Sequence, residues 1–307
     1  MNGHDVFIHI GITKAASSTL QKFFAEHEAL GFVNRNKTAK VLTASNPFAY
    51  DLEKARDFFT ENVRKNASEG KIPVFSHERL GGNPHSGHYD AREIANRLHA
   101  IVPHARILLC IREQMGMLAS CYKHYIRIGG VRTLSDYLLP KWDQRMPLFD
   151  WTFYEYHRII LYYFDLFGRS HVQIMLVEEL QKNPQGFYED LCGFMGAACP
   201  DFRRFDKVVN PGIPDNEVDS YRIMNFLKTE KASIRDPNIF PSAINTVLKG
   251  YACGNALWGK LRWRNKQRDI REEVRALFEG KFLESNSLTG RLLSKKLDTY
   301  GYEVLAT

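Results

Sequence analysis

The chain has 307 residues, which is enough for one large α/β domain or for one domain with a helical appendage. Hydrophobic residues make up 44% of it and charged residues 25%, so its composition is that of a globular protein. No apolar run approaches the roughly 20 residues of a membrane-spanning helix, so no such helix is expected. The net charge of +7 favours an anionic partner: a nucleotide, an acidic glycan, a membrane surface or nucleic acid.

The chain enters its first apolar run almost at once. No basic start, apolar core and small-residue cleavage site precede that run, so no secretory signal is expected. No CxxC pair and no framework spacing occur among the five cysteines, which are Cys110, Cys121, Cys192, Cys199 and Cys253. An odd number of cysteines without an export signal predicts reduced thiols and a cytoplasmic location.

The most informative stretch lies near the N-terminus. An apolar run, Val6 to Ile10, stops at Gly11, and a loop of small and polar residues with one lysine follows. Leu20, Phe23 and Phe24 then recur at helical spacing. This pattern predicts a strand, a loop and a helix.

A helix that opens in this way aims its free N–H groups and the positive end of its dipole at the loop before it. Ser17, Ser18 and Thr19 add hydroxyl groups, and Lys14 adds a positive charge. Together these groups can hold a phosphate. The Walker pattern GxxxxGK[ST] is absent and no acidic magnesium partner stands out, so no metal is expected. The alternative is an ordinary strand-to-helix turn with a solvated lysine.

Alternating strands and helices follow this loop, which is typical of βαβ units and a mostly parallel sheet. Further strands are expected at Ile72–Ser76, Arg106–Ile111 and His171–Val177, and helices at Tyr50–Val63, Asp90–Val102, Phe153–Phe167 and Pro184–Met195. We therefore expect an α/β fold, with a mostly parallel central sheet flanked by helices and a helical C-terminal region.

A second candidate site follows the strand that ends at Ile111. Arg112 stands at the tip of this strand, and Ser120 follows eight positions later on the next helix. Ligands of open parallel sheets bind at the carboxyl ends of the strands, so Arg112 is expected at the same edge as Lys14. Its planar guanidinium suits a phosphate. The alternative is an exposed arginine with a serine on the helix surface.

Both segments resemble the donor site of the sulfotransferases. The matches to the donor-binding loop of that family are Lys14, Ser17, Ser18, Leu20 and Gln21. Arg112 and Ser120, with Tyr122 shortly after, resemble the site for the 3′-phosphate of the donor. The chain departs from the family at Ala15-Ala16, where many members carry Thr-Gly or Ser-Gly, because alanine takes a positive φ less readily than glycine.

The resemblance implies a PAPS-dependent sulfotransferase of the bacterial or glycan type with a P-loop-like fold, where PAPS is 3′-phosphoadenosine 5′-phosphosulfate. It implies donor contacts from Lys14, Ala15, Ala16, Ser17, Ser18, Thr19, Arg112 and Ser120. The implied acceptor is a hydroxyl of a glycan, a lipid-linked sugar or a small molecule, with protein tyrosine as a further candidate and no nucleic acid.

Sulfuryl transfer needs a cation for the leaving phosphate and a base for the acceptor hydroxyl. Lys14 is the candidate cation. The loop after the second long strand offers Glu78 as the base, with His77 as the close alternative, because glycan sulfotransferases generally use a glutamate and some a histidine. Neighbours on a strand point to opposite faces, so both residues face one site only if the backbone turns there.

Residues 1–214 are expected to form the donor-binding core, and residues 215–307 a helical region packed on the same domain. A basic and aromatic segment, 258–268, is interpreted as a solvated stretch with its tryptophans packed inward; a weak membrane-surface contact is the alternative. Two other functions stay open: a P-loop nucleotide kinase, and a non-catalytic sulfotransferase-like protein that binds the nucleotide.

Overall fold

The computed structural model describes residues 6–43, 46–144, 147–201, 203, 212–227 and 268–306. Residues 258–267 of the expected basic segment, and most of the loop at 202–214, lie outside the described residues. Contacts divide the chain into two units. Unit 1 contains residues 1–114, 144–209 and 280–307, and unit 2 contains residues 115–143 and 210–279. The expected division at residue 214 stays a prediction.

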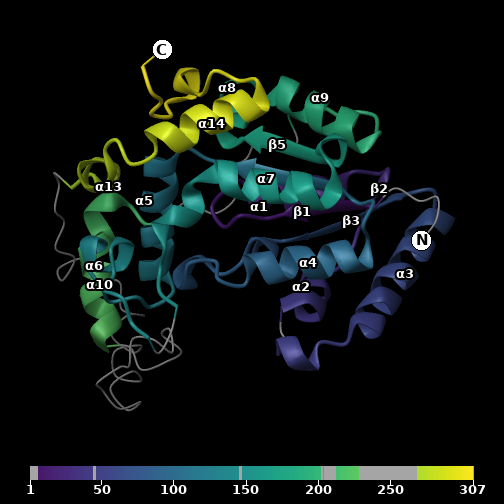
Figure 1. Cartoon of the computed structure of the whole chain (residues 1–307), viewed down its shortest axis with the longest axis horizontal. Helices are drawn as coiled ribbons and strands as arrows, with labels where there is room; N and C mark the ends of the chain where they lie inside the picture. The colour runs from purple at the N-terminus through teal and green to yellow at the C-terminus, as the bar shows by residue number, and fades with distance from the viewer. Residues whose placement is uncertain are drawn as a thin grey trace, which may run out of the picture. The chain divides into compact units, whose positions relative to one another are not determined.

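Unit 1 is built on a sheet of five parallel strands in the order β2-β3-β1-β4-β5 (Figure 1). The strands are β1 (Phe7–Ile10), β2 (Leu30–Phe32), β3 (Ile72–His77), β4 (Arg106–Ile111) and β5 (Val172–Leu176). In the parallel register Ile10 lies beside His77 of β3 on one side and beside Leu109 of β4 on the other. The expected α/β fold with a parallel central sheet is therefore confirmed.

The helices alternate with the strands along the chain. The α-helices are α1 (Ser17–Glu26), α2 (Arg35–Thr43), α3 (Leu52–Ser68), α4 (Ala91–Ile101), α5 (Gln114–Arg127), α6 (Leu134–Leu138), α7 (Tyr156–Phe167), α8 (Val177–Lys182), α9 (Pro184–Met195), α10 (Val218–Leu227), α13 (Ile270–Phe278) and α14 (Leu283–Leu293). Short 3-10 turns are η1 (Pro47–Ala49), η2 (Glu78–Gly81), η3 (Pro84–Ser86), η4 (Trp151–Tyr154), η5 (Arg169–His171), η7 (Asp215–Glu217) and η8 (Leu297–Tyr300).

Helices cover both faces of the sheet, as side-chain contacts of alternating strand residues show. On one face, Phe7 of β1 makes edge-on contacts with Phe24 of α1 at 5.8 Å and with Phe194 of α9 at 5.9 Å between ring centroids. On the other face, Phe75 of β3 stacks on Phe59 of α3 at 4.2 Å. Helices α4 and α7 run side by side in front of the sheet in Figure 1. These layers bury the strands on both sides, which explains their nearly unbroken apolar sequences.

The helix expected over Phe153–Phe167 is wrong in its first turn. The side chain of Asp150 accepts a hydrogen bond from the N–H of Thr152 at 2.9 Å and starts the separate turn η4. Glu155 then leaves the helical region with ψ 74°, and α7 begins at the next residue. Aromatic periodicity runs through this break, so the sequence pattern does not reveal it.

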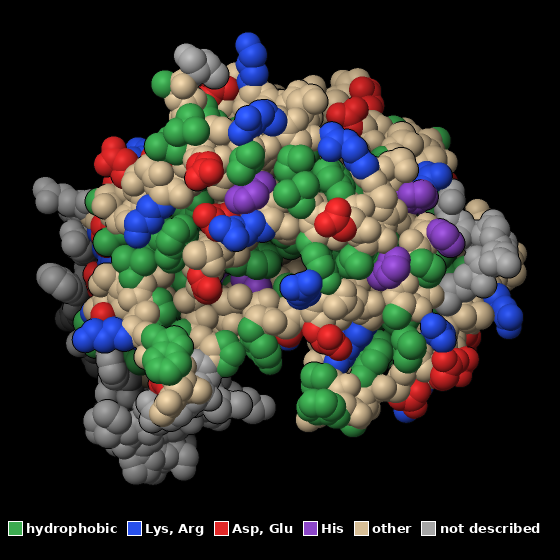
Figure 2. All heavy atoms as spheres, viewed as in Figure 1, with side chains coloured by type: hydrophobic (Ala, Val, Ile, Leu, Met, Phe, Trp, Pro, Cys, Tyr) green, Lys and Arg blue, Asp and Glu red, His purple; other side chains and the backbone are tan. Residues whose placement is uncertain are grey.

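Charges of both signs are interspersed on the face drawn in Figure 2, and no single sign gathers there. The net charge of +7 therefore does not mark a basic patch on this face. Among the described residues, no helix combines the length and the apolar character needed to cross a bilayer.

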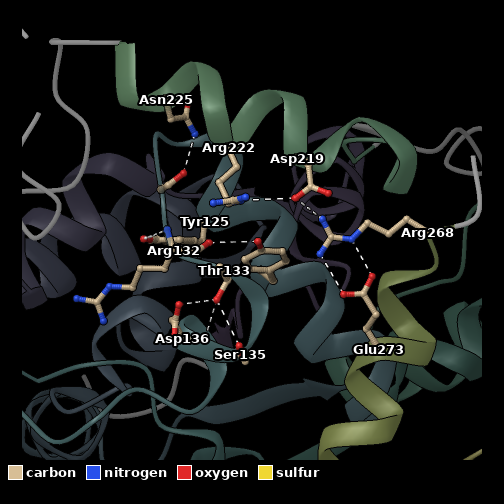
Figure 3. A network of polar contacts seen from close by, with 12 residues as sticks. Tyr125, Arg132, Thr133, Ser135, Asp136, Asp219, Arg222, Asn225, Arg268 and Glu273 are labelled. Carbon is tan, nitrogen blue, oxygen red and sulfur yellow. Dashed lines mark hydrogen bonds and ion pairs between the residues drawn. The ribbon is translucent and has the colours of Figure 1, made fainter. Parts of the chain in front are cut away.

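Unit 2 is held by polar contacts between helices that are distant in sequence (Figure 3). Arg268 lies between two carboxylates, 2.6 Å from Asp219 and 2.7 Å from Glu273. Burial lowers the pKa of Arg268, and these two carboxylates more than reverse that effect. The side-chain amide of the buried Asn225 donates to the carbonyls of Ile126 at 2.7 Å and of residue 130 at 2.8 Å. These contacts tie α5, α10 and α13 together.

Candidate functional site

The loop between β1 and α1 has an unusual backbone. Lys14 has φ 75° and Ala16 has φ 59°, both in the left-handed region that L-residues with a Cβ occupy at a cost of about 1–2 kcal/mol. Two bonds to the carbonyl of Ile12 close the turn, from the N–H of Ala15 at 3.0 Å and from the Ser17 hydroxyl at 3.2 Å. Backbone strain kept at two nearby residues is a feature of binding and catalytic loops.

This backbone suits an anion. Residues that alternate between left-handed and other conformations turn successive N–H groups toward one concave surface. Helix α1 begins at Ser17 with Ala16 as its N-cap, and it has no side-chain cap and no acidic residue in its first turn. Its first N–H groups therefore lack intrahelical partners, and its positive dipole end faces the loop. Ala16 takes a positive φ that glycine would adopt at lower cost.

Gly11 brings the end of β3 against this loop. A Cβ at Gly11 would lie 2.8 Å from the Cα of Glu78 and 3.0 Å from the carbonyl oxygen of His77. No residue with a side chain fits at that separation, so glycine is required by close packing. The two candidate base residues are thereby placed beside the start of the loop that carries Lys14.

His77 and Glu78 differ in what their side chains do. Strand β3 ends at His77 and η2 begins at Glu78, so the backbone turns between them. Nδ1 of His77 accepts the N–H of Arg79 at 2.9 Å. Burial lowers the pKa of His77, the Glu78 carboxylate opposes this, and Arg35 and Arg79 reinforce it. A neutral imidazole that accepts at Nδ1 carries its proton on Nε2, where it cannot then accept another.

The rest of the loop after β3 is held by His88. Its ring donates through Nδ1 to the carbonyl of Gly81 at 2.5 Å and contacts the Tyr154 hydroxyl through Nε2 at 3.2 Å. It also stacks on Phe153 with ring centroids 3.5 Å apart. Burial lowers the pKa of His88 to about 4, so the ring is neutral at physiological pH. Both ring nitrogens of His88 are therefore engaged in contacts within the fold. The described residues contain no cluster of three His, Cys, Asp or Glu side chains that could hold a metal.

Arg112 lies at the same rim as the Lys14 loop. Strand β4 pairs with β1, so the two loops leave neighbouring strands. The Arg112 guanidinium donates through Nη1 to the carbonyl oxygen of Lys14 at 3.4 Å. The structure therefore brings these two predicted residues together. Ser120 lies on α5, partly exposed, and belongs to unit 2, so its pairing with Arg112 stays a prediction.

A buried polar chain ties α1 to β3 beneath the loop. His9 contacts the Ser76 hydroxyl at 2.8 Å, and the Gln21 amide donates to the same hydroxyl at 3.3 Å. Arg35 donates to the side-chain carbonyl of Gln21 at 3.0 Å. Burial lowers the pKa of His9 to about 3, so its ring stays neutral in the core. Gln21 therefore has a structural role: it contacts Ser76, the residue before His77 on β3. The sequence motif that contains Gln21 did not predict this contact.

Sequence reasoning missed the residues that hold Arg112. The carbonyl of Arg112 accepts the Tyr156 hydroxyl at 2.7 Å. One carboxylate oxygen of Glu178 accepts the N–H of Glu113 at 2.9 Å, and the other accepts the Tyr302 hydroxyl at 3.2 Å. Burial raises the pKa of Glu178, although these hydrogen bonds and the charge of Arg112 oppose it. Glu178 comes directly after the strand expected over 171–177, and that position alone does not identify these partners.

A cavity of about 620 Å³ in unit 1 lies elsewhere, along the open edge of β2. Its lining comes from β2, α1, α2, α3 and the residues before β3, and includes Gly31, Phe32, Lys37, Phe58, Asn62 and Asn66. None of the predicted site residues lines it. The candidate site therefore rests on the loops at the carboxyl ends of β1, β3 and β4.

Comparison with known proteins identifies the fold. A sulfotransferase from Alicyclobacillus acidocaldarius has a TM-score of 0.54 and 14% sequence identity, over 97% of this chain and 99% of that one. The chain therefore has the sulfotransferase fold, as the sequence resemblance predicted.

Two further solved structures are similar at lower TM-scores. The sulfotransferase domain of the Synechococcus PCC 7002 olefin synthase has a TM-score of 0.44 and 12% identity, over 82% of this chain and 97% of that one. A mouse sulfotransferase complexed with PAP has a TM-score of 0.39 and 11% identity, over 89% of this chain and 88% of that one. No family model and no curated protein matches the sequence.

Proposed function

We propose that this chain is a sulfotransferase that moves a sulfuryl group from PAPS to a hydroxyl group of an acceptor. The observation that carries the proposal is the contact between the Arg112 guanidinium and the carbonyl of Lys14. It joins two cationic residues from neighbouring strands at one rim of a parallel sheet, where ligands of such folds bind. The sulfotransferase fold supports the same conclusion.

The loop residues 14–19 hold the 5′ end of the donor in this proposal. Their N–H groups and the dipole of α1 attract the 5′-phosphate. Lys14 neutralises the negative charge that develops on this phosphate when it becomes the leaving group. Arg112 holds a phosphate at the other end of the nucleotide with charge-assisted hydrogen bonds, and Ser120 contributes its hydroxyl. No metal ion is needed, because these residues supply the positive charge.

Glu78 acts as the base. The acceptor oxygen attacks sulfur, the bond from sulfur to the bridging phosphate oxygen breaks, and the acceptor proton passes to the Glu78 carboxylate. The products are the sulfated acceptor, adenosine 3′,5′-bisphosphate and one proton. The hydrogen bond that His77 accepts from Arg79 favours Glu78 over His77 for this step. The acceptor is a hydroxyl of a glycan, a glycolipid or a small molecule.

Labelled sulfate transfer from PAPS into a panel of sugars, glycolipids and small alcohols tests the activity. Glu78→Gln should lower the rate by about 10²–10⁴. His77→Asn is the matched variant, since its side-chain oxygen still accepts the N–H of Arg79, and it should retain most of the rate. A rate lost with His77→Asn and kept with Glu78→Gln would assign the base to His77 instead.

Two other functions give different results in binding experiments. A P-loop nucleotide kinase binds ATP with magnesium and does not prefer adenosine 3′,5′-bisphosphate. A non-catalytic nucleotide-binding protein binds the bisphosphate but transfers no label to any acceptor. Melting shifts with each nucleotide, followed by the transfer assay, separate all three.

A further inference from the structure

The corner that carries Arg112 is held by three consecutive residues, each with a different partner. The carbonyl of Arg112 accepts from Tyr156 of α7, and the N–H of Glu113 donates to Glu178 of α8. Gln114, the first residue of α5, is fixed through its side chain. Nothing in the local sequence of this corner supplies those partners.

The partner of Gln114 comes from the C-terminal part of the chain. The side-chain amides of Gln114 and Asn286 form two hydrogen bonds, at 2.6 Å and 3.2 Å, and each residue is only 1% exposed. The same nitrogen of Asn286 also donates to the carbonyl of Glu303 at 2.8 Å. A reciprocal amide pair in a dry site fixes both position and direction, because losing either partner leaves buried polar atoms unpaired.

Glu178 also depends on the C-terminal residues. Its second carboxylate oxygen accepts the hydroxyl of Tyr302, which is 3% exposed. Tyr302 is followed by Glu303, whose carbonyl accepts the hydrogen bond from Asn286. The contacts with Glu178 and with Asn286 are therefore made by two adjacent residues of the C-terminal segment. This segment reaches the corner through Glu178 and Asn286, and it does so at the residues next to Arg112.

We propose that Asn286 of α14, together with Tyr302 and Glu303, forms a positioning element of the anion site, which holds the Arg112 corner so that the guanidinium faces the Lys14 loop. Tyr302 and Asn286 are positioning residues, since they act through Glu178 and Gln114. This inference rests on the proposed donor site, where Arg112 binds a phosphate. It assigns part of the donor affinity to residues about 170 to 190 positions away in sequence.

The test is a double-mutant cycle between Tyr302→Phe and Arg112→Ala, read as the dissociation constant of adenosine 3′,5′-bisphosphate in calorimetry. Tyr302→Phe should weaken binding about five- to tenfold in the otherwise unchanged protein, as the loss of one hydrogen bond to a charged acceptor implies. With Arg112→Ala it should change affinity by less than about twofold, because its effect passes through Arg112. Equal weakening in both backgrounds would overturn the inference.

A second measurement does not depend on any nucleotide. Amide hydrogen exchange of the peptide over 107–118 should be faster at Glu113 with Tyr302→Phe, since the carboxylate that accepts its N–H is less well held. Unchanged exchange there contradicts the inference. An unmodified protein that fails to bind the bisphosphate overturns the proposed function, and the exchange result then decides the positioning role alone.

Two further variants serve as controls. Tyr300→Phe removes a hydroxyl from the same segment, one that interacts with Glu179 rather than Glu178, and should leave the affinity unchanged. Glu178→Gln keeps an acceptor for the N–H of Glu113 and a donor for the Tyr302 oxygen. Its dissociation constant for adenosine 3′,5′-bisphosphate should therefore lie within about threefold of that of the unmodified protein. If Glu178→Gln binds as weakly as Glu178→Ala, the inference is wrong.

Discussion

The corners after β1 and after β4 lie side by side at one rim of the sheet, yet they are built differently. The β1 corner is local: its shape comes from positive φ at Lys14 and Ala16 and from bonds to Ile12, all within six residues. The β4 corner is assembled from distant parts, through Tyr156, Glu178, Asn286 and Tyr302. The first corner takes its backbone shape from its own residues, although Arg112 contacts the carbonyl of Lys14. The second corner depends on the packing of three other helices and the C-terminal segment, so it should be more sensitive to changes elsewhere in the chain.

Of the two corners, the one after β1 should give the larger effect, through its cation. Lys14→Ala should lower sulfuryl transfer by about 10²–10³, since it removes the positive charge where negative charge develops. The measurement is labelled sulfate transfer at saturating PAPS, with circular dichroism to verify the fold. Lys22→Ala, on helix α1 after this loop and paired with Glu26 at 4.0 Å, is the matched control and should keep full activity. Equal rates for Lys14→Ala and Lys22→Ala would remove Lys14 from the mechanism.

The assembled corner should show a smaller loss, and in binding rather than in rate. Arg112→Ala should weaken the binding of adenosine 3′,5′-bisphosphate about 10- to 100-fold, because charge-assisted hydrogen bonds to a phosphate are lost. Arg112→Lys should recover only part of the affinity, because an ammonium group cannot make two parallel bonds. Calorimetry measures both. Affinity that is unchanged by Arg112→Ala would place the nucleotide elsewhere.

The loop after β3 neighbours the local corner, and its buried histidine gives a pH-dependent contribution to stability. His88 is neutral in the fold, with its pKa lowered by burial from 6.5 to about 4. The unfolded chain therefore binds more protons between these values, so the contribution is complete above pH 6.5 and is lost as pH falls toward 4.

In the His88→Gln variant, the unfolding free energy should therefore fall less steeply with decreasing pH between 6.5 and 4. The difference in slope should be on the order of 1 kcal/mol per pH unit. Urea unfolding at several pH values measures the slope. The expected result is a shallower slope than in the unmodified protein, whatever the stability at pH 7. An identical slope would show that folding does not lower the pKa of His88, which would contradict the effect of burial.

The smallest effect tests the strain in the local corner. Ala16→Gly should raise the unfolding free energy by up to about 1 kcal/mol, because glycine adopts φ 59° without a Cβ clash. Ala15→Gly is the control: Ala15 is buried and has no positive φ, so glycine there should destabilise by about 0.5–1 kcal/mol. Both values come from thermal or urea unfolding. Destabilisation by Ala16→Gly would contradict the strained backbone.

The same contrast explains what the sequence could predict. Apolar runs revealed four of the strands, and the order of strand, loop and helix revealed the corner after β1, because those signals are local. The rule that parallel strands share a carboxyl edge was enough to place Arg112 near Lys14. The contacts of Asn286 and Tyr302 had no such signal, since single polar residues on distant helices carry no periodicity.

Some local features were also beyond the sequence. Helix α2 is mostly polar and was not predicted, since it presents only a weak apolar face. The break at Glu155 was hidden by the aromatic pattern on either side of it. The hydrogen bond from Arg79 to His77, which separates the two candidate bases, depends on where β3 ends, and element boundaries are the least certain part of a prediction from sequence.

The most direct test is calorimetric titration of the unmodified chain with adenosine 3′,5′-bisphosphate in the absence of magnesium, repeated with Lys14→Ala and with Arg112→Ala. We expect one bound nucleotide per chain, with weaker binding in each variant. Binding that requires magnesium and prefers ATP, or that neither substitution weakens, would contradict it.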